Sequence, residues 1–388
     1  MTTTSQFSKL FLKTYQGKRV LVTGHTGFKG SWLSMWLLEL EAKVAGFSKY
    51  VPTKPSAFEA MDLTNRLQDF RGDVRNMEEL KAIFKEFRPQ IVFHLAAQPL
   101  VRDSYQEPRL TFETNVMGTI NVLECVRDSS IVEAAVIITS DKCYENVNWE
   151  WGYREIDRLG GEDPYSASKA CAELAFRTYA HSYFHREKDA WLATTRAGNV
   201  IGGGDWAKDR IVPDCVKAWY SREVPVIRKP EATRPWQHVL EPLSGYLWLG
   251  ALLNHRLPDI NGESFNFGPD PDVVKSVEEL VEALIAHSGK GRWEYRPPED
   301  NKKEANLLKL NCDKALNRLE WSPVLNFEET VAMTAEWYKK YYAGGADMYD
   351  FGHRQIQEYV QKAAAKKLAW AMGKEHDRRS KSRASQEV

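Results

Sequence analysis

The 388-residue sequence lacks the features that would place it in a membrane or in an oxidising compartment. Its five cysteines are scattered without CxxC spacing, and an odd number of isolated thiols argues against a disulfide framework and a structural zinc site. No apolar run is long enough to span a bilayer, and the first residues, MTTTSQFSKLFLKTYQGK, contain no apolar core of signal-peptide length. We therefore expect a cytoplasmic protein with no metal site and no membrane contact.

The sequence also has no excess of either charge. Lysine plus arginine and aspartate plus glutamate number 53 each, so no net field attracts the chain to nucleic acid. Its basic cluster, Arg378-Arg379-Ser380-Lys381, lies in a polar, aperiodic terminus without interleaved aromatic residues, which is typical of a solvated tail. These absences favour work on a small molecule.

Short apolar strands alternate with amphipathic helices over the first 200 residues. The strand-like runs are RVLVTG, KVAGFS, IVFHLAA, AAVIITS and WLATTRAGNV. This alternation predicts a doubly wound α/β fold, a parallel sheet of the Rossmann type, in residues 1–200. Segments rich in glycine, proline and tryptophan then interrupt the pattern, so we expect a smaller α/β lobe in residues 201–345, with some crossing of the chain between lobes. Residues 346–388 are expected to form a C-terminal helix and the basic tail.

A glycine-rich segment, TGHTGFKG, follows the first expected strand and opens a helix. Glycines in this context permit a tight turn and let the backbone approach a pyrophosphate at the helix N-terminus. Farther along, GDV could bind the adenine amino group through its acid, and the small residues of HLAAQ would line a dinucleotide. The predicted cofactor contacts are Gly24, Thr26, Gly27, Phe28, Gly30, Asp73, Val74, Ala96, Ala97 and Gln98.

The second expected strand ends without the acid that usually binds the ribose of NAD. That acid is expected about 20 residues after the first glycine, where the sequence reads Gly46-Phe47-Ser48-Lys49. Lys49 could favour the 2′-phosphate of NADP, or it could be a solvated surface lysine. The residues alone leave both cofactors open.

Two segments predict the reacting centre. Tyr165 and Lys169 stand at i and i+4 near the start of an expected helix, so their side chains share a face, and the lysine could lower the pKa of the phenol from about 10. Such a tyrosine can remove a hydroxyl proton while hydride leaves the same carbon. Upstream, a strand ends at Ser140-Asp141-Lys142, where ligands bind in open α/β sheets.

With these motifs in order, the sequence resembles the extended short-chain dehydrogenases/reductases, through TGxxGxxG, DV, AAQ, TNVMGT with Asn115, and YSASK. Within that superfamily, the runs HTGFKGSWL, TSDKCYEN, AGNVIGGGDWAKDRIVPD and TRPWQHVLEPLSGYL resemble the CDP-glucose 4,6-dehydratases. The resemblance extends to about residue 340. It implies NAD as a tightly held cofactor, Asn115 among its contacts, and CDP-glucose as the substrate.

The resemblance further implies a lyase reaction and the roles of its residues. C4 of the hexose is oxidised, water leaves across C5 and C6, and the hydride returns to C6. Tyr165 would be the base at the C4 hydroxyl and Ser140 would orient the C4 oxygen. Lys169 would lower the pKa of the tyrosine and hold the nicotinamide ribose, and Asp141 would protonate the leaving hydroxyl.

The base at C5 is left open by this comparison. Related dTDP-glucose dehydratases have a glutamate where this sequence has Lys142, which could serve if burial and the nearby Lys169 keep it neutral, or could only stabilise an enolate. For the nucleotide diphosphate, the resemblance points to Arg234. Asn199, Asp209 and Arg210 are further candidates for substrate binding.

Two other functions fit parts of the pattern. A nucleotide-sugar 4-epimerase would share the fold, the glycine turn and the Tyr-Lys pair, but would have no use for an acid such as Asp141. A non-catalytic NAD-binding regulatory protein would share only the fold. The resemblance also implies a homodimer or homotetramer that associates through the YxxxK helix and the helix after Asn115.

Overall fold

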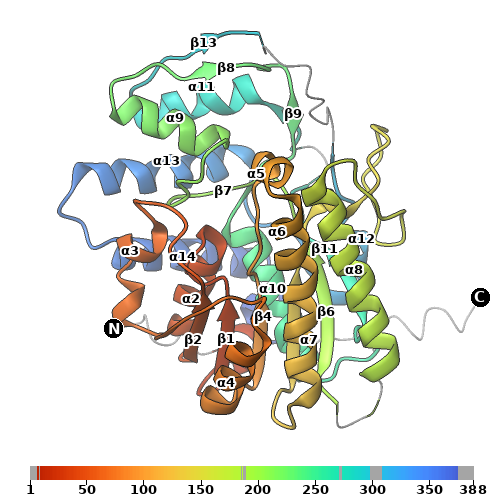
Figure 1. The fold of residues 1–388 in the computed structure, drawn as a ribbon. Coiled ribbons are helices and arrows are strands. Elements are labelled where there is room, and N and C mark those ends of the chain that lie inside the picture. The colour runs from red at the N-terminus through yellow and green to blue at the C-terminus, as the bar shows by residue number, and fades with distance from the viewer. Residues whose placement is uncertain are drawn as a thin grey trace, which may run out of the picture.

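The computed structural model of the chain describes residues 7, 9–184, 186, 189–270, 273–297 and 308–374. At its centre lies a seven-stranded parallel sheet in the order β11-β6-β5-β4-β1-β2-β3 (Figure 1). Its strands are β1 (Arg19–Thr23), β2 (Lys43–Ser48), β3 (Gln68–Arg71), β4 (Ile91–His94), β5 (Ala134–Ile138), β6 (Trp191–Arg196) and β11 (Glu263–Asn266). The strand order reverses between β1 and β4, which is where ligands bind in such sheets. The predicted doubly wound parallel sheet is confirmed.

Helices cover both faces of the sheet because side chains alternate along each strand. Val20 and Val22 face one core, and Leu21 between them faces the other. The first core receives α2 (Phe28–Glu39) and α10 (Leu240–Asn254), with α14 (Met348–Ala365) packed against α2. The second receives α4 (Met77–Phe87), α7 (Gly118–Asp128) and α8 (Pro164–Tyr183). Short turns complete this part: η1 (Leu10–Lys13), α3 (Ala57–Ala60), η2 (Leu63–Asn65), α5 (Val101–Gln106), α6 (Pro108–Phe112), the π-helical η3 (Glu113–Met117) and η4 (Asp141–Cys143).

Most of the remaining elements lie beyond one end of the sheet, where α9, α11, β8 and β13 form a cap (Figure 1). The helices are α9 (Ile211–Tyr220), α11 (Val277–Ser288), α12 (Asp313–Leu319) and α13 (Phe327–Ala343). Three two-stranded pairs join β7 (Val200–Ile201) to β10 (Gln237–His238), β8 (Val226–Ile227) to β13 (Glu294–Tyr295) and β9 (Thr233–Arg234) to β12 (Lys275–Ser276). After β10 the chain returns to the main sheet as α10 and β11. The predicted boundaries at residues 200 and 345 stay predictions.

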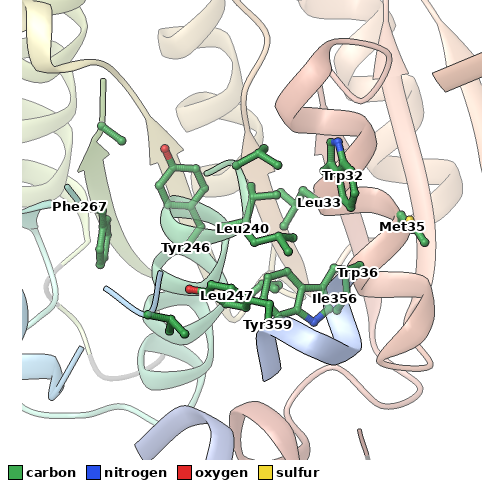
Figure 2. Packing of buried hydrophobic residues seen from close by; sticks show 14 of the residues in the cluster. Trp32, Leu33, Met35, Trp36, Leu240, Tyr246, Leu247, Phe267, Ile356 and Tyr359 are labelled. Carbon is green, nitrogen blue, oxygen red and sulfur yellow. The ribbon is translucent and has the colours of Figure 1, made fainter. Parts of the chain in front are cut away.

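The two ends of the described chain meet under α2. The ring of Phe11 stacks on that of Trp370 in α15 (Ala369–Met372), with centroids 5.1 Å apart and planes at 6°. Trp36 and Tyr359 complete this aromatic cluster, and Figure 2 shows both between α2, α10 and α14. The predicted C-terminal helix is present as α14, whereas the basic cluster at residues 378–381 lies outside the described residues. In the described part of the chain, no helix combines the length and apolar character needed to cross a bilayer.

Candidate active site

One cavity of about 2120 Å³ runs from the glycine turn after β1 to helix α9 of the cap and to the neighbouring strand β9. It is large enough for a dinucleotide and a second ligand, since pockets for single ligands measure roughly 300–1,000 Å³. Nearly every residue predicted from the sequence lines it. These are Gly24, Thr26, Gly27, Phe28, Gly30, Asp73, Val74, Ala96, Ala97, Gln98, Ser140, Asp141, Lys142, Tyr165, Lys169, Asn199, Asp209, Arg210 and Arg234.

The glycine turn forms a cradle in which side chains have no room. Gly24 has φ +77°, and a Cβ there would lie 2.7 Å from the backbone nitrogen of Ala96. A Cβ on Gly30 would lie 2.1 Å from the carbonyl oxygen of Gly24. Gly27 precedes the first residue of α2, so the free N–H groups of the helix open onto the cavity. This bare, positively polarised backbone fits a pyrophosphate.

The acid predicted for the adenine end is held by basic side chains. Asp73 lies 2.6 Å from the guanidinium of Arg75 and 3.1 Å from the ammonium of Lys49. Hydrogen bonds from Arg75 hold the pKa of Asp73 well below its usual range. Lys49 is therefore engaged by a carboxylate of the same wall.

Asn115 is the predicted cofactor residue that the structure places behind the cavity wall. Its side chain is 1% exposed and accepts a hydrogen bond from the Gln98 backbone N–H at 2.8 Å. Its amide also donates to the Ser168 hydroxyl at 2.8 Å. Asn115 thus ties the loop after β4 to α8. It positions the cavity wall and does not line it.

Tyr165 and Lys169 lie on the face of α8 that borders the cavity. Asp163 caps this helix by accepting from the Ser166 N–H at 3.0 Å, and Pro164 occupies its first position. Burial raises the pKa of Tyr165 to about 12, although its hydrogen bond with Ser140 acts in the opposite direction. Burial lowers the pKa of Lys169 to about 8. That Lys169 lowers the pKa of the tyrosine stays a prediction for the complex with cofactor.

Ser140 and Asp141 lie at the carboxyl end of β5, both 5% exposed. The Ser140 hydroxyl donates to the Asp141 carboxylate at 3.0 Å. Gly198 provides the space for this carboxylate, because a Cβ there would lie 1.8 Å from Asp141 Oδ2. An acid group therefore lies next to the serine that contacts Tyr165.

The exposure of Lys142 differs from the expectation. It borders the cavity, but it is exposed, so the burial on which its neutrality was expected to depend is absent. The side chains before and after it, Asp141 and Cys143, point inward instead. The 3-10 turn η4 explains the difference, because three successive residues of such a turn point in three directions.

The arginines expected to bind the nucleotide lie toward the cap. Arg210 forms an ion pair with Asp205 at 2.7 Å, and its charge also lowers the pKa of Tyr165. Arg234 lies in β9, where its guanidinium donates to the carbonyl of Thr233. Asp209 pairs with Arg102 at 3.2 Å. Of these groups, Arg210 is thus the one whose charge acts on the reacting tyrosine.

Sequence reasoning missed Lys29, which also lines the cavity. It belongs to the glycine segment and was passed over as part of the turn. The available signal was a lysine in the first turn of a helix, where the helix dipole disfavours a cation.

Comparisons with known proteins show the family of this chain. The family model described as GDP-mannose 4,6 dehydratase matches residues 21–334. A curated relative, the CDP-glucose 4,6-dehydratase of Salmonella typhimurium, is 46% identical over 350 residues, which cover 89% of this chain and 97% of the relative.

Solved structures of similar proteins contain NAD. The dTDP-glucose 4,6-dehydratase of Streptomyces venezuelae, solved with NAD, is 25% identical with a TM-score of 0.71, over 83% of this chain and 97% of its own. The UDP-glucose 4-epimerase of Thermus thermophilus, also solved with NAD, is 25% identical with a TM-score of 0.71, over 84% of this chain and all of its own.

Proposed function

This chain belongs to the GDP-mannose 4,6 dehydratase family, and we propose that it is the NAD-dependent lyase that converts CDP-D-glucose to CDP-4-dehydro-6-deoxy-D-glucose. The observation that carries the proposal is the buried carboxylate of Asp141 beside Ser140 and Tyr165. A 4-epimerase needs the tyrosine and the lysine, but it loses no water and needs no acid at C6. The acid therefore favours dehydration.

The backbone of the glycine turn at Gly24, Gly27 and Gly30 and the loop of residues 96–98 would hold NAD. The chemistry that bound NAD would supply is acceptance of hydride from C4 of the hexose and its return to C6. Because the cofactor is regenerated in each cycle, the reaction consumes no external reductant.

Tyr165 removes the proton from the C4 hydroxyl, and Ser140 and Lys169 stabilise its phenolate. Asp141, in its protonated form, then donates a proton to the departing C6 hydroxyl, which leaves as water while a base of the cavity wall takes the C5 proton. Both groups are buried, so bulk water does not compete for these protons. Arg210 adds positive charge beside the tyrosine.

The nucleotide diphosphate lies toward the cap, against Arg234 and Arg210, with Asn199 at the same wall. The choice of CDP over other nucleotides rests on the 46% identical relative. We also propose deoxysugar synthesis for polysaccharides such as O-antigen as the pathway and the cytoplasm as the location, in keeping with five free thiols.

A homodimer or homotetramer is part of the proposal. Two exposed apolar side chains support it, since Met117 in η3 is 49% exposed and Leu174 in α8 is 50% exposed. Leu174 lies on the YxxxK helix, and Met117 directly precedes α7, the helix after Asn115; these are the two helices through which association is expected. Sedimentation of the purified protein, with Leu174→Glu as a variant, tests this part: the variant should sediment as a smaller species.

The first experiment is incubation of the purified protein with CDP-glucose, dTDP-glucose, GDP-mannose and UDP-glucose in separate reactions. Loss of one water from CDP-glucose, measured by mass spectrometry, supports the proposal. Inversion at C4 without loss of water would instead establish an epimerase. NAD bound without turnover of any of the four would favour a regulatory protein.

A further inference from the structure

Lys29 occupies an unusual position, in the first turn of α2 directly after the glycine turn. Its ammonium lies 5.9 Å from the centre of the Tyr246 ring on α10, and its side chain lines the cavity. In the described part of the chain, we find neither a hydrogen bond nor an ion pair to this ammonium. The charged groups close enough to act on it are Asp141 in η4, Lys169 in α8 and Arg210 before α9.

In the described part of the chain, the face of the Tyr246 ring and the charge of Asp141 favour a cation there, but neither contacts the ammonium through a hydrogen bond or an ion pair. The N-terminal end of α2 carries partial positive charge, and two of the three charged neighbours of Lys29 are cations. Groups left in this condition inside a cavity are candidates for work on a ligand, because structural charges are usually paired. Lys29 is therefore better explained by the substrate than by stability.

The state of this amine also differs from that of an ordinary lysine. Burial lowers the pKa of Lys29 to about 8; Lys169 and Arg210 act in the same direction, and Asp141 opposes them. A substantial fraction of Lys29 is thus a neutral amine in mildly alkaline solution, ready to accept a proton. Lys142, the lysine expected for this role, is exposed.

We propose that Lys29 is the base that takes the C5 proton, a proposal that rests on the proposed function. The neutral amine accepts the C5 proton as the C6–oxygen bond breaks and Asp141 protonates the departing hydroxyl. A double bond forms between C5 and C6 of the 4-keto sugar, and one water is released. When hydride adds to C6, the Lys29 ammonium returns the proton to C5.

The test compares Lys29→Met and Lys29→Arg with Lys142→Met, the variant of the competing candidate. In the two Lys29 variants we expect turnover of CDP-glucose to fall about 10²- to 10⁴-fold. NAD content should be unchanged, and reduced cofactor should accumulate, since C4 oxidation precedes the blocked step. With wild-type enzyme in D₂O, the product should carry deuterium at C5. In Lys142→Met, reduced cofactor should not accumulate, because C5 deprotonation does not depend on this lysine.

A fourth variant guards against a merely structural effect. Lys29→Ala should regain turnover when methylamine is added, because the cavity has room for a small amine that replaces the missing side chain. Melting temperatures show whether each variant folds. In the wild type, turnover should also rise with pH as Lys29 loses its proton, with an apparent pKa near 8.

Several outcomes would overturn the assignment. Loss of NAD from Lys29→Met would make this lysine a cofactor anchor. Full activity of Lys29→Arg would mean that only its charge matters, and accumulation of reduced cofactor in Lys142→Met would return the role to Lys142. These results presuppose an active wild type. If the wild type dehydrates a different nucleotide hexose, the choice of CDP-glucose fails and the variants are compared on that sugar; if it dehydrates none, the proposed function and the role of Lys29 fail together.

Discussion

Two groups of buried charges lie close together on α8 and differ in how the chain satisfies them. Glu173 pairs with Arg196 at 2.7 Å and also accepts hydrogen bonds from the hydroxyls of Thr139, Thr194 and Ser264. One helical turn earlier, Lys169 has a single hydrogen bond within the described residues, of 3.4 Å, to the carbonyl of Ile138. Both groups are at least 94% buried. Side chains of the protein itself satisfy Glu173 and Arg196, which we call the closed pair. Lys169 lacks such partners and is called the open group, because a ligand can supply them.

The difference indicates how to separate structure from function in this molecule. Burial alone does not mark a catalytic group, since Glu173 and Lys169 are buried alike. Incomplete pairing at a cavity wall does mark one, because the energetic cost of such a charge must be offset by a ligand. Substitution at the closed pair should therefore affect stability, and substitution at the open group should affect turnover.

The largest effect should follow from Tyr165→Phe. Without the phenol, no base reaches the C4 hydroxyl, and turnover should fall about 10³-fold or more. Melting temperature should hardly change. Tyr179→Phe, on the same helix but hydrogen-bonded to Glu124, is the matched control and should retain activity. Equal losses in both variants would contradict the distinction.

The second-largest effect should follow from Arg196→Met, and it should be a loss of stability. It leaves the Glu173 carboxylate buried without its cation, which costs about 3–5 kcal/mol of the free energy of unfolding. Urea denaturation measures this loss. The double variant Glu173→Leu/Arg196→Met should recover much of it, because no unpaired charge remains. If Arg196→Met were as stable as the wild type, the Glu173–Arg196 pair would not be needed to keep the buried carboxylate satisfied.

Glu241 is satisfied less completely than Glu173 and more completely than Lys169. The pH dependence of stability measures this intermediate case. It accepts hydrogen bonds from the Tyr359 hydroxyl and from the backbone N–H groups of Val324 and Leu325, but it has no paired cation among them. Burial raises its pKa to about 7. Since the folded state binds this proton more tightly than the unfolded state, the contribution is complete at pH values below about 4.5. It should decline as pH rises to 7, by about 3 kcal/mol. Glu241→Gln should remove that slope in urea titrations at pH 4.5, 6 and 7.5, and an unchanged slope would contradict this.

The smallest effect should come from an exposed pair. Arg109 contacts Glu113 at 2.6 Å on the helix surface, and its side chain is 91% exposed. Arg109→Ala should cost about 0.5 kcal/mol or less and should leave turnover unchanged. A loss above about 1 kcal/mol in urea denaturation would show that distance matters more here than burial.

The sequence was informative where chemistry imposes a local pattern. The glycine turn must be bare for backbone to approach backbone, and Tyr165 and Lys169 must be four residues apart to share a helix face, so both were found by spacing. The edge strand β11 was not found, because its sequence, ESFN, contains a single apolar residue, whereas the equally short β4 begins with three. The small strand pairs of the cap were missed because two residues are too few to show a period.

Side-chain direction was the other limit. Lys142 follows the active-site acid in sequence, yet the turn η4 directs it outward, and spacing alone does not give that rotation. Asn115, expected at the cofactor, binds Gln98 and Ser168 behind the wall, and its contact with the cofactor stays a prediction. The place of Lys29 in the active site could not be predicted from the sequence, because its neighbours in space, Asp141 and Lys169, are more than a hundred residues away in the chain.

The stacking of Phe11 on Trp370 has a consequence for the order in which the protein is made. The segment before β1 leaves the ribosome about 360 residues ahead of its partner helix. At 5–20 residues per second, the two are separated by roughly 20–70 s. During that interval the apolar side of α2, with Trp36, has neither Tyr359 nor Trp370 to cover it. This surface of the nascent chain therefore stays exposed to aggregation until α14 and α15 emerge. A chain that stops before α14 should be a substrate for chaperones.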